Sequence, residues 1–353
     1  MSARSVVVVG AGAVGLGCAL FLQADGWDVT LIDRAEPGQQ TSYGNAGILA
    51  VQSVSPINGP DVVKTLPSLL TSSTSPLRLR RRDLWATAPW LVAFLRRCTP
   101  AAGDRSARAQ AALVREAGTA WRILLQRTGG GERVGWRGWL KLAEDAREAA
   151  GLAGERRRLD AAGQAYAWLD GDGVAALDPA LAPRFTAGLW LTDTGHVDRP
   201  GELLRHIAGR FTAEGGRLVT DEVRDLREHG DGVVVEGGAA TYRGAYAVLA
   251  TGPWSAALAR RLGCRVPLVA ERGYHLTLPQ SEAPLARPIY SARRSFVLAP
   301  MGASLRLTAG AEIARLDTAP DERPIRALLG EVRRLLPRAR TEVAASWLGR
   351  RPS

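Results

Sequence analysis

The sequence predicts an α/β fold with two domains, one built on a parallel sheet covered on both faces, the other on a mixed or antiparallel sheet with additional helices. Three observations predict it. The chain has 353 residues, of which 46% are hydrophobic, enough to fill two cores. Its first 33 residues follow a strand, glycine turn, helix, strand pattern. Beyond residue 263, short apolar runs between turn residues are typical of antiparallel strands.

The N-terminal unit begins with four consecutive valines at 6–9, which predict a strand buried on both faces. Gly10, Gly12 and Gly15 then form G-x-G-x-x-G, and a helix is expected over 13–23. In this fingerprint the first glycine allows the tight turn, the second lets a pyrophosphate approach the backbone, and the third lets helix and strand pack closely. The phosphates would lie on the helix N-terminus, where free N–H groups favour negative charge.

A second strand, expected over 27–32, leads into Asp33, which lies 18 residues after Gly15. This is close to the spacing of a carboxylate that hydrogen-bonds a ribose hydroxyl. The sequence therefore predicts a Rossmann-like dinucleotide site. The alternative is an ordinary βαβ unit with chance glycines. Asp33 does not decide between NAD and FAD, because both carry an adenosine ribose.

The formal charge is +11, and arginine supplies nearly all of it, since Lys64 and Lys141 are the only lysines. No basic stripe is interleaved with aromatic residues, so we expect no nucleic-acid partner. An anionic substrate or an anionic membrane surface stays compatible with this charge. The three cysteines are scattered and the four histidines dispersed. We therefore expect no metal site and a reducing, cytoplasmic location.

Amphipathic periodicity and capping residues predict the helices. Asp83 is expected to be the N-cap of a helix rich in tryptophan and leucine. The glycines at 129–131 and 215–216 are expected to end two others, and a Ser/Thr/Pro-rich linker is expected at 71–76. The expected helices are 61–70, 84–97, 104–127, 145–159, one ending at 174–179, 200–213, 255–262 and 325–336.

Apolar runs bounded by turn residues predict the remaining strands. The strand at 245–250 runs into Gly252, a second strand–glycine–helix turn, which a discontinuous cofactor domain needs when the chain returns to it. We expect one domain over 1–52 and 196–262, and a second, with a helical insertion, over 53–195 and 263–353. The other expected strands are 136–142, 187–192, those around 218, 223 and 233–235, 274–278, 295–298 and 305–308.

Motifs spread along the whole chain carry a family resemblance. They are VVVVGAGAVGLGCALFL, the acid at 33, TSYGNAG at 41–47, GHVDRPGEL at 195–203, ATGPWS at 250–255, ERGYHL at 271–276, APMGASLRLTAGAE at 299–312 and WLGRRPS at 347–353. With these the chain resembles flavin-dependent D-amino-acid dehydrogenases of the D-amino-acid oxidase superfamily. The resemblance implies FAD rather than NAD. Because TSYGNAG holds neither histidine nor cysteine, we expect the FAD to be non-covalent.

The resemblance also implies which residues contact FAD. The three fingerprint glycines would take the pyrophosphate and Asp33 the adenosine ribose. Val223, in a strand before a hairpin, would contact adenine through its backbone, and Gly252 and Trp254 would close over the phosphates. The alternative for Val223 and Trp254 is a core position. The residues expected along the ribityl chain and isoalloxazine are Arg34, Ser42, Asn45, Ala46 and Gly47.

The reaction that the resemblance implies is oxidation of the Cα–N bond of a D-amino acid, or of a cyclic imino acid such as D-proline or D-hydroxyproline, in bacterial D-amino acid catabolism. Hydride passes to FAD, and the imino acid is hydrolysed to a 2-oxo acid or stays cyclic. One alternative is a glycine or sarcosine oxidase-type flavoprotein that uses oxygen. Relatives continue past W-x-G-x-R-P-[ST] into a segment that reaches the flavin, whereas this sequence stops at Ser353. A C-terminally truncated chain, and with it a non-catalytic FAD-binding subunit or remnant, is therefore a further alternative.

A substrate carboxylate calls for a planar cation, which arginine provides. Strand alternation puts Arg272 and Tyr274 on one face and His275 on the other. We therefore rank Tyr274 above His275, for which a core position is the favoured interpretation. Arg293 and Tyr290 are weaker candidates. The candidate catalytic residues are Arg272, Tyr274, His275, Tyr43 and Arg294.

A quinone or another redox carrier is the expected electron acceptor. Arginines at 78 and 80–82 precede the tryptophan-bearing helix, and such a segment can lie on the anionic cytoplasmic face of the inner membrane. The favoured alternative is that this helix packs its tryptophans Trp85 and Trp90 into the second domain while the arginines are solvated.

Overall fold

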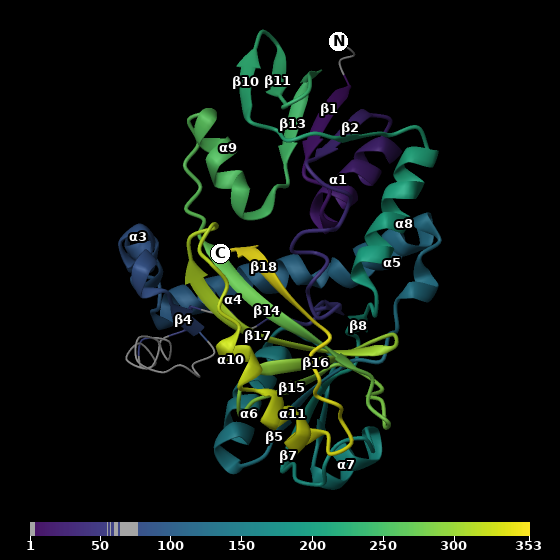
Figure 1. Ribbon diagram of the computed structural model, residues 1–353, viewed down its shortest axis with the longest axis vertical. Helices are drawn as coiled ribbons and strands as arrows, with labels where there is room; N and C mark the ends of the chain where they lie inside the picture. Colours follow the sequence, from purple (N-terminus) through teal and green to yellow (C-terminus); the bar gives the residue numbers. More distant parts are fainter. Residues whose placement is uncertain (1–3, 55, 57, 60–62, 64–76) are drawn as a thin grey trace.

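A four-stranded parallel sheet forms the upper part of the computed structural model, which describes residues 4–54, 56, 58–59, 63 and 77–353 (Figure 1). Its strand order is β13-β1-β2-β9, and every neighbouring pair is parallel. The expected unit β1–α1–β2 is confirmed. The elements are β1 (Ser5–Val9), α1 (Ala13–Ala24), β2 (Asp28–Asp33), β9 (Arg217–Thr220) and β13 (Tyr246–Leu249).

The four valines of β1 are buried because each face of the sheet carries a different layer. Val6 and Val8 pack with α1 and α8 (Pro200–Ala213), whereas Val7 and Val9 pack with a three-stranded meander and α9 (Ser255–Arg261). The continuous valine run thus reflects a sheet covered on both sides. The meander consists of β10 (Asp225–His229), β11 (Gly232–Glu236) and β12 (Thr241–Gly244).

A nine-stranded mixed sheet forms the lower part of the molecule in Figure 1. Its order is β18-β14-β17-β16-β15-β5-β7-β6, with β4 added beside β17. Neighbours are antiparallel except β15 with β5 and β17 with β4, so the mixed sheet is confirmed. Its strands are β4 (Leu77–Leu79), β5 (Trp139–Ala143), β6 (Ala167–Leu169), β7 (Ala187–Leu191), β14 (Ala270–Pro279), β15 (Ile289–Ser291), β16 (Phe296–Met301), β17 (Ser304–Ala314) and β18 (Ala345–Pro352).

The two faces of this sheet differ. One face buries leucines of β14 and β17 against two short helices near the C-terminus. The other face points towards the 41–47 loop, since His275 of β14 contacts that loop. A two-stranded ribbon links the two parts, β3 (Ile48–Leu49) with β8 (Gly195–His196). The helices around this sheet are α3 (Leu84–Leu95), α4 (Pro100–Arg115), α5 (Ala117–Thr128), α6 (Ala146–Ala161), α7 (Gly171–Leu177), α10 (Arg323–Arg326) and α11 (Leu329–Leu335).

Three sequence predictions about elements are wrong. The single helix expected over 104–127 breaks at Glu116 into α4 and α5, because α4 packs beside α6 whereas α5 packs on the core of the parallel sheet. The single helix expected over 325–336 is also divided into two helices, α10 and α11. Val223 lies between β9 and β10 rather than in a strand.

Asp83 is a further correction. It precedes α3 but makes no capping bond to it. Its carboxylate instead accepts hydrogen bonds from the Arg315 backbone N–H, at 3.1 Å, and from the Thr318 hydroxyl. Asp83 therefore ties the start of α3 to the end of β17.

The expected helix at 61–70 and linker at 71–76 lie, apart from residue 63, outside the described residues. The proposed domain boundaries stay a prediction. They place α5 in the second domain, yet Leu124 and Leu125 pack on the core of the parallel sheet. Among the described residues, no helix is long and apolar enough to cross a bilayer.

Candidate active site

The three fingerprint glycines form a backbone cradle at the start of α1. Gly10 has a φ of +107°, and a Cβ there would lie 2.5 Å from the carbonyl oxygen of Ala250. A Cβ on Gly15 would lie 1.7 Å from the carbonyl oxygen of Gly10, so strand and helix touch here. Gly12 is the N-cap of α1, and it supplies no side-chain cap. Free helical N–H groups at a glycine-lined turn fit a phosphate.

Asp33 and the second glycine turn lie beside this cradle. The Asp33 carboxylate accepts the N–H of Ala11 at 2.7 Å and that of Ala35 at 3.0 Å. The Arg34 guanidinium lies 4.2 Å from the centroid of the Trp254 ring. Gly252, just before Trp254, has a φ of +58°. Residues expected from distant motifs to contact one cofactor are thus neighbours in space, whereas the Val223 side chain packs on the core behind β2.

The 41–47 loop connects the cradle to the nine-stranded sheet. On one side, the Ser42 hydroxyl accepts the N–H of Ala13 at 3.2 Å. On the other, Arg306 of β17 donates to the backbone oxygens of Tyr43 and Asn45, at 3.2 and 2.7 Å. The Asn45 side chain folds back on the loop, accepting the Gly47 N–H at 2.7 Å. The loop is therefore held by both parts of the molecule.

Two buried histidines lie against this loop. The Nδ1–H of His275 donates to the Gly44 carbonyl oxygen at 2.8 Å, and its ring stacks on Trp347 with centroids 5.3 Å apart. His196 lies beside Gly47, and its Nε2 has no hydrogen-bond partner among the described residues. Burial lowers the pKa of both histidines to about 4, so both are neutral at pH 7.

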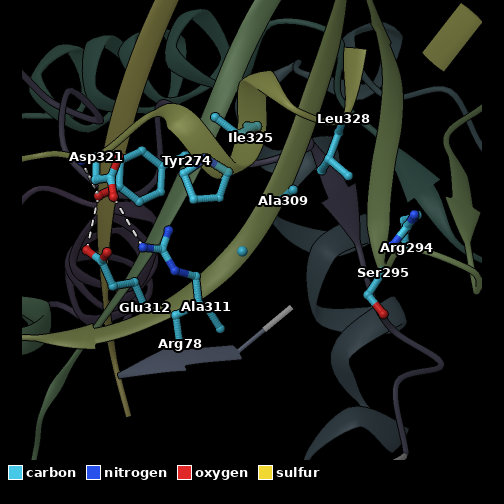
Figure 2. Close-up of a pocket in the computed structure, with 12 residues that line it drawn as sticks. Arg78, Tyr274, Arg294, Ser295, Ala309, Ala311, Glu312, Asp321, Ile325 and Leu328 are labelled. Atoms are coloured by element: carbon cyan, nitrogen blue, oxygen red, sulfur yellow. Dashed lines mark hydrogen bonds and ion pairs between the residues drawn. The ribbon is translucent and has the colours of Figure 1, made fainter. Parts of the chain in front are cut away.

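Arg272 and Tyr274 lie on the opposite face of β14 from His275, as expected. The Arg272 side chain is 0% exposed; its Nε is 3.4 Å from Glu312, and it donates to the Tyr274 hydroxyl at 3.3 Å. The Tyr274 hydroxyl donates to Glu312 at 3.0 Å and accepts the Asp321 N–H at 3.1 Å. Figure 2 shows Tyr274, Glu312 and Asp321 meeting at one end of a small cavity of about 40 Å³.

Two further arginines join these residues, Arg78 of β4 and Arg80 just after it. We call the whole group the buried ion-pair cluster and define it as Arg78, Arg80, Arg272, Tyr274, Glu312 and Asp321. Arg78 pairs with Asp321 at 3.2 Å, and Arg80 with Glu312 at 3.3 Å. Hydrogen bonds from Arg323 and, to a smaller extent, from Arg78 hold the pKa of Asp321 well below its usual range. Arg294 lines the small cavity but pairs with Glu331, at 3.3 Å.

A large cavity of about 460 Å³ opens on the sheet face that carries His275. Its polar groups are few. Arg351 of β18 pairs with Glu271 at 2.7 Å and donates to the Gly310 carbonyl oxygen at 3.0 Å. The Oγ1 of Thr308, which is paired in register with His275, is buried and has no hydrogen-bond partner in the part of the chain that the structure describes. The apolar lining comes from Leu77, Leu79, Trp90, Leu91, Phe94, Leu95, Val297, Ala309, Ala311 and Ile313.

A sequence model of the DAO family, described as FAD dependent oxidoreductase, matches residues 5–353. The chain belongs to the DAO family of FAD-dependent oxidoreductases. It is 31% identical over 360 residues to a D-amino-acid oxidase of Bradyrhizobium diazoefficiens, covering 99% of this chain and 85% of that protein. It is 33% identical over 374 residues to D-amino acid dehydrogenase 2 of Pseudomonas aeruginosa, with the same coverage.

Solved structures of other enzymes show the same fold. A glycine oxidase from Geobacillus kaustophilus superposes with a TM-score of 0.72 at 22% identity, covering 99% of this chain and 83% of that one. An L-proline dehydrogenase from P. horikoshii superposes with a TM-score of 0.69 at 15% identity, covering 98% and 81%. At these identities the likeness shows the fold alone.

The residues present fit the FAD of the DAO family. The start of α1, whose N-cap Gly12 brings no side chain, suits the pyrophosphate, and the orphaned Nε2 of His196 lies beside the loop expected to take the isoalloxazine. No role was predicted from the sequence for His196, Arg306 or Arg351. The motifs GHVDRPGEL, APMGASLRLTAGAE and WLGRRPS contain these three residues, but only the fold brings His196 against the loop and Arg351 to a cavity.

The buried histidines predict a pH dependence of stability. An unfolded histidine has a pKa near 6.5, so between pH 6.5 and 4 the unfolded chain binds more protons than the folded one. The free energy of unfolding should therefore fall as the pH falls through this window, by roughly 3 kcal/mol per histidine at pH 4. His275→Asn, whose amide can still donate to Gly44, should flatten the slope measured by denaturant titration. The exposed His229→Gln should not, and an unchanged slope in His275→Asn would contradict the assignment.

Proposed function

We propose that this chain oxidises the Cα–N bond of a D-amino acid with FAD as the electron acceptor. The large cavity supports this proposal, because its described lining includes the arginine Arg351 and, on the face that carries His275, the hydroxyl of Thr308, which has no partner among the described residues. His275 contacts the 41–47 loop, so cavity and cofactor loop adjoin. The names of the relatives above support a D-amino acid as the substrate.

Two polar groups of the cavity, Arg351 and Thr308, have a use in this reaction. The Arg351 guanidinium binds the substrate carboxylate, and Thr308 offers a hydroxyl to it or to the amine. Both histidines are neutral, and Nδ1–H of His275 is donated to Gly44, so we assign His275 to holding the loop rather than to proton abstraction. FAD, when bound, supplies the acceptor for the hydride on Cα. Water then hydrolyses the released imino acid to a 2-oxo acid and ammonia.

Anaerobic mixing of the FAD-loaded protein with D- and L-amino acids tests this function. We expect D-enantiomers to bleach the oxidised flavin spectrum and L-enantiomers to leave it unchanged. Reoxidation by a quinone analogue but slowly by air would identify a dehydrogenase, which we propose. Rapid reoxidation by air would identify an oxidase. Bleaching by L-enantiomers alone, or by none, would refute the function.

We further propose that α3 contacts an anionic membrane surface. Trp85 of α3 is 93% exposed, and the exposed residues Arg82, Arg96 and Arg97 lie at its two ends. This differs from the predicted basic patch, because Arg78 and Arg80 point inward to Asp321 and Glu312. An exposed tryptophan with flanking arginines suits a headgroup region, each arginine adding roughly 1 kcal/mol.

Co-sedimentation with anionic and neutral vesicles tests this contact. Wild-type protein should pellet with anionic vesicles and be released by 1 M salt, where the Debye length is about 3 Å. Trp85→Ser should reduce pelleting about tenfold or more. Leu113→Ser, on the neighbouring helix α4 and 79% exposed, is the matched control. Equal pelleting of wild type and Trp85→Ser would exclude α3 as the contact.

A further inference from the structure

We infer that the large cavity selects D-amino acids with a large apolar side chain, and that Trp90 and Phe94 of α3 are the residues that select them. This inference rests on the proposed function and adds the substrate class to it. It follows from how polar and apolar groups are distributed along the cavity wall.

The two charged groups of the cavity lie together at one place on its wall. Arg351 and Glu271 form an ion pair there, and Ser353 donates from its hydroxyl to Glu271 at 2.7 Å. Among the described lining residues, this pair carries the only charges. A substrate whose carboxylate meets Arg351 therefore extends its side chain along a wall with no charged partner. Charged side chains would lose hydration there without compensation.

The aromatic part of the cavity wall is built by α3. The rings of Trp90 and Phe94, one helical turn apart, stack with centroids 5.1 Å apart and an interplanar angle of 8°. The Nε1–H of Trp90 donates to the Ser353 carbonyl oxygen at 3.1 Å, and that oxygen also accepts the Val269 N–H. The indole is thus held in one orientation by the segment that carries Arg351. The distance between carboxylate anchor and aromatic wall is set by the fold.

Strand β4 forms another part of the cavity wall, and its alternating sequence explains how it does so. Alternation places Leu77 and Leu79 on the cavity side, whereas Arg78 points away to Asp321. The buried ion-pair cluster therefore fixes β4 against β17 and keeps its leucines in the wall. This gives the run L-R-L-R a structural role: leucines line the pocket and arginines anchor the strand.

The size of the cavity also argues for a large side chain. About 460 Å³ is the volume of roughly 15 water molecules, far more than glycine or alanine would displace. A small substrate would leave water in contact with the apolar wall, whereas the side chain of D-leucine or D-phenylalanine would displace that water. Each additional methylene-sized group that a substrate buries in an apolar pocket raises kcat/KM by about 10- to 200-fold.

The test compares kcat/KM for D-phenylalanine, D-leucine, D-alanine and D-aspartate. We expect wild type to prefer D-phenylalanine and D-leucine over D-alanine by about 100-fold, with D-aspartate poorest. Phe94→Ala should lower kcat/KM for D-phenylalanine at least tenfold through KM and change D-alanine less than threefold. Val92→Ala, on the same helix but 47% exposed, is the control. A preference for D-alanine, or equal losses for both substrates in Phe94→Ala, would overturn the inference.

Calorimetric binding of unreactive acids separates this inference from the proposed function. Wild type should bind 3-phenylpropionate at least tenfold more tightly than propionate, and Phe94→Ala should remove the difference. Equal affinity of wild type for the two acids would overturn the apolar pocket, whether or not any D-amino acid reduces the flavin. Failure of flavin reduction with the affinity difference intact would overturn only the proposed function.

Discussion

Arg351→Ala should lower kcat/KM for D-amino acids by two to three orders of magnitude without changing FAD content. Arg351 is the arginine that lines the large cavity among the described residues, with its side chain 45% exposed. Truncating a charged group that pairs with a buried carboxylate costs about 2–5 kcal/mol, or roughly 30- to 4,000-fold in rate. Steady-state kinetics with D-leucine, alongside flavin absorbance per protein, measures both quantities.

Other arginines provide the controls. Arg351→Lys keeps the charge but loses the bidentate geometry, so an intermediate loss is expected. Arg294→Ala, which breaks a surface pair with Glu331, should change kcat/KM little. Arg272→Ala should unfold the protein at lower denaturant, because it leaves the buried Glu312 short of a partner, at a cost of about 3–5 kcal/mol. If Arg272→Ala were stable with a greatly raised KM, and Arg351→Ala were fully active, then Arg272 and not Arg351 would bind the substrate carboxylate.

Gly12→Val should abolish FAD retention while the polypeptide still folds. A Cβ at Gly12 would have only the Ser42 hydroxyl near it, at 3.3 Å, so the apoprotein can accommodate a side chain. The same side chain would occupy the approach of the pyrophosphate to the start of α1. Flavin absorbance after gel filtration, together with the circular dichroism spectrum, measures the two effects.

Gly17→Ala is the matched control, since it lies in the same helix and a Cβ there meets nothing within 4 Å. It should retain FAD as wild type does. Acid precipitation of wild type should release all yellow colour to the supernatant, as expected for non-covalent FAD. Normal flavin content in Gly12→Val would remove the fingerprint from the cofactor site, and colour left on the precipitate would show a covalent flavin.

The N-terminal unit could be predicted from sequence because its signals are local. Four valines, three glycines and Asp33 lie within one stretch, and each describes a single strand, turn or helix end. The strand alternation of Arg272, Tyr274 and His275 was likewise predicted correctly. Which of the two faces meets the cofactor loop was not predictable, because it depends on how the nine-stranded sheet packs against the parallel sheet. That choice placed His275, and not Arg272, beside the 41–47 loop.

The incorrect predictions have the same cause, because these features depend on tertiary packing that the sequence alone does not show. Residues 104–127 have continuous helical periodicity, but α4 and α5 face different cores, and only tertiary packing breaks the chain at Glu116. Asp83 has the chemistry of an N-cap, yet β17 and the residues after it offer it better donors. Arg351 belongs to a short motif with an adjacent arginine, and only pairing of β18 with β14 aims it at the cavity.

A crystal structure of the FAD-loaded protein with bound 3-phenylpropionate tests most directly whether the large cavity is the substrate site. The carboxylate should lie within hydrogen-bond distance of the Arg351 guanidinium, with the phenyl ring against Trp90 and Phe94 and the flavin against the 41–47 loop. A ligand bound with its carboxylate at Arg272 or Arg294, or a flavin whose ring is remote from the large cavity, would contradict it.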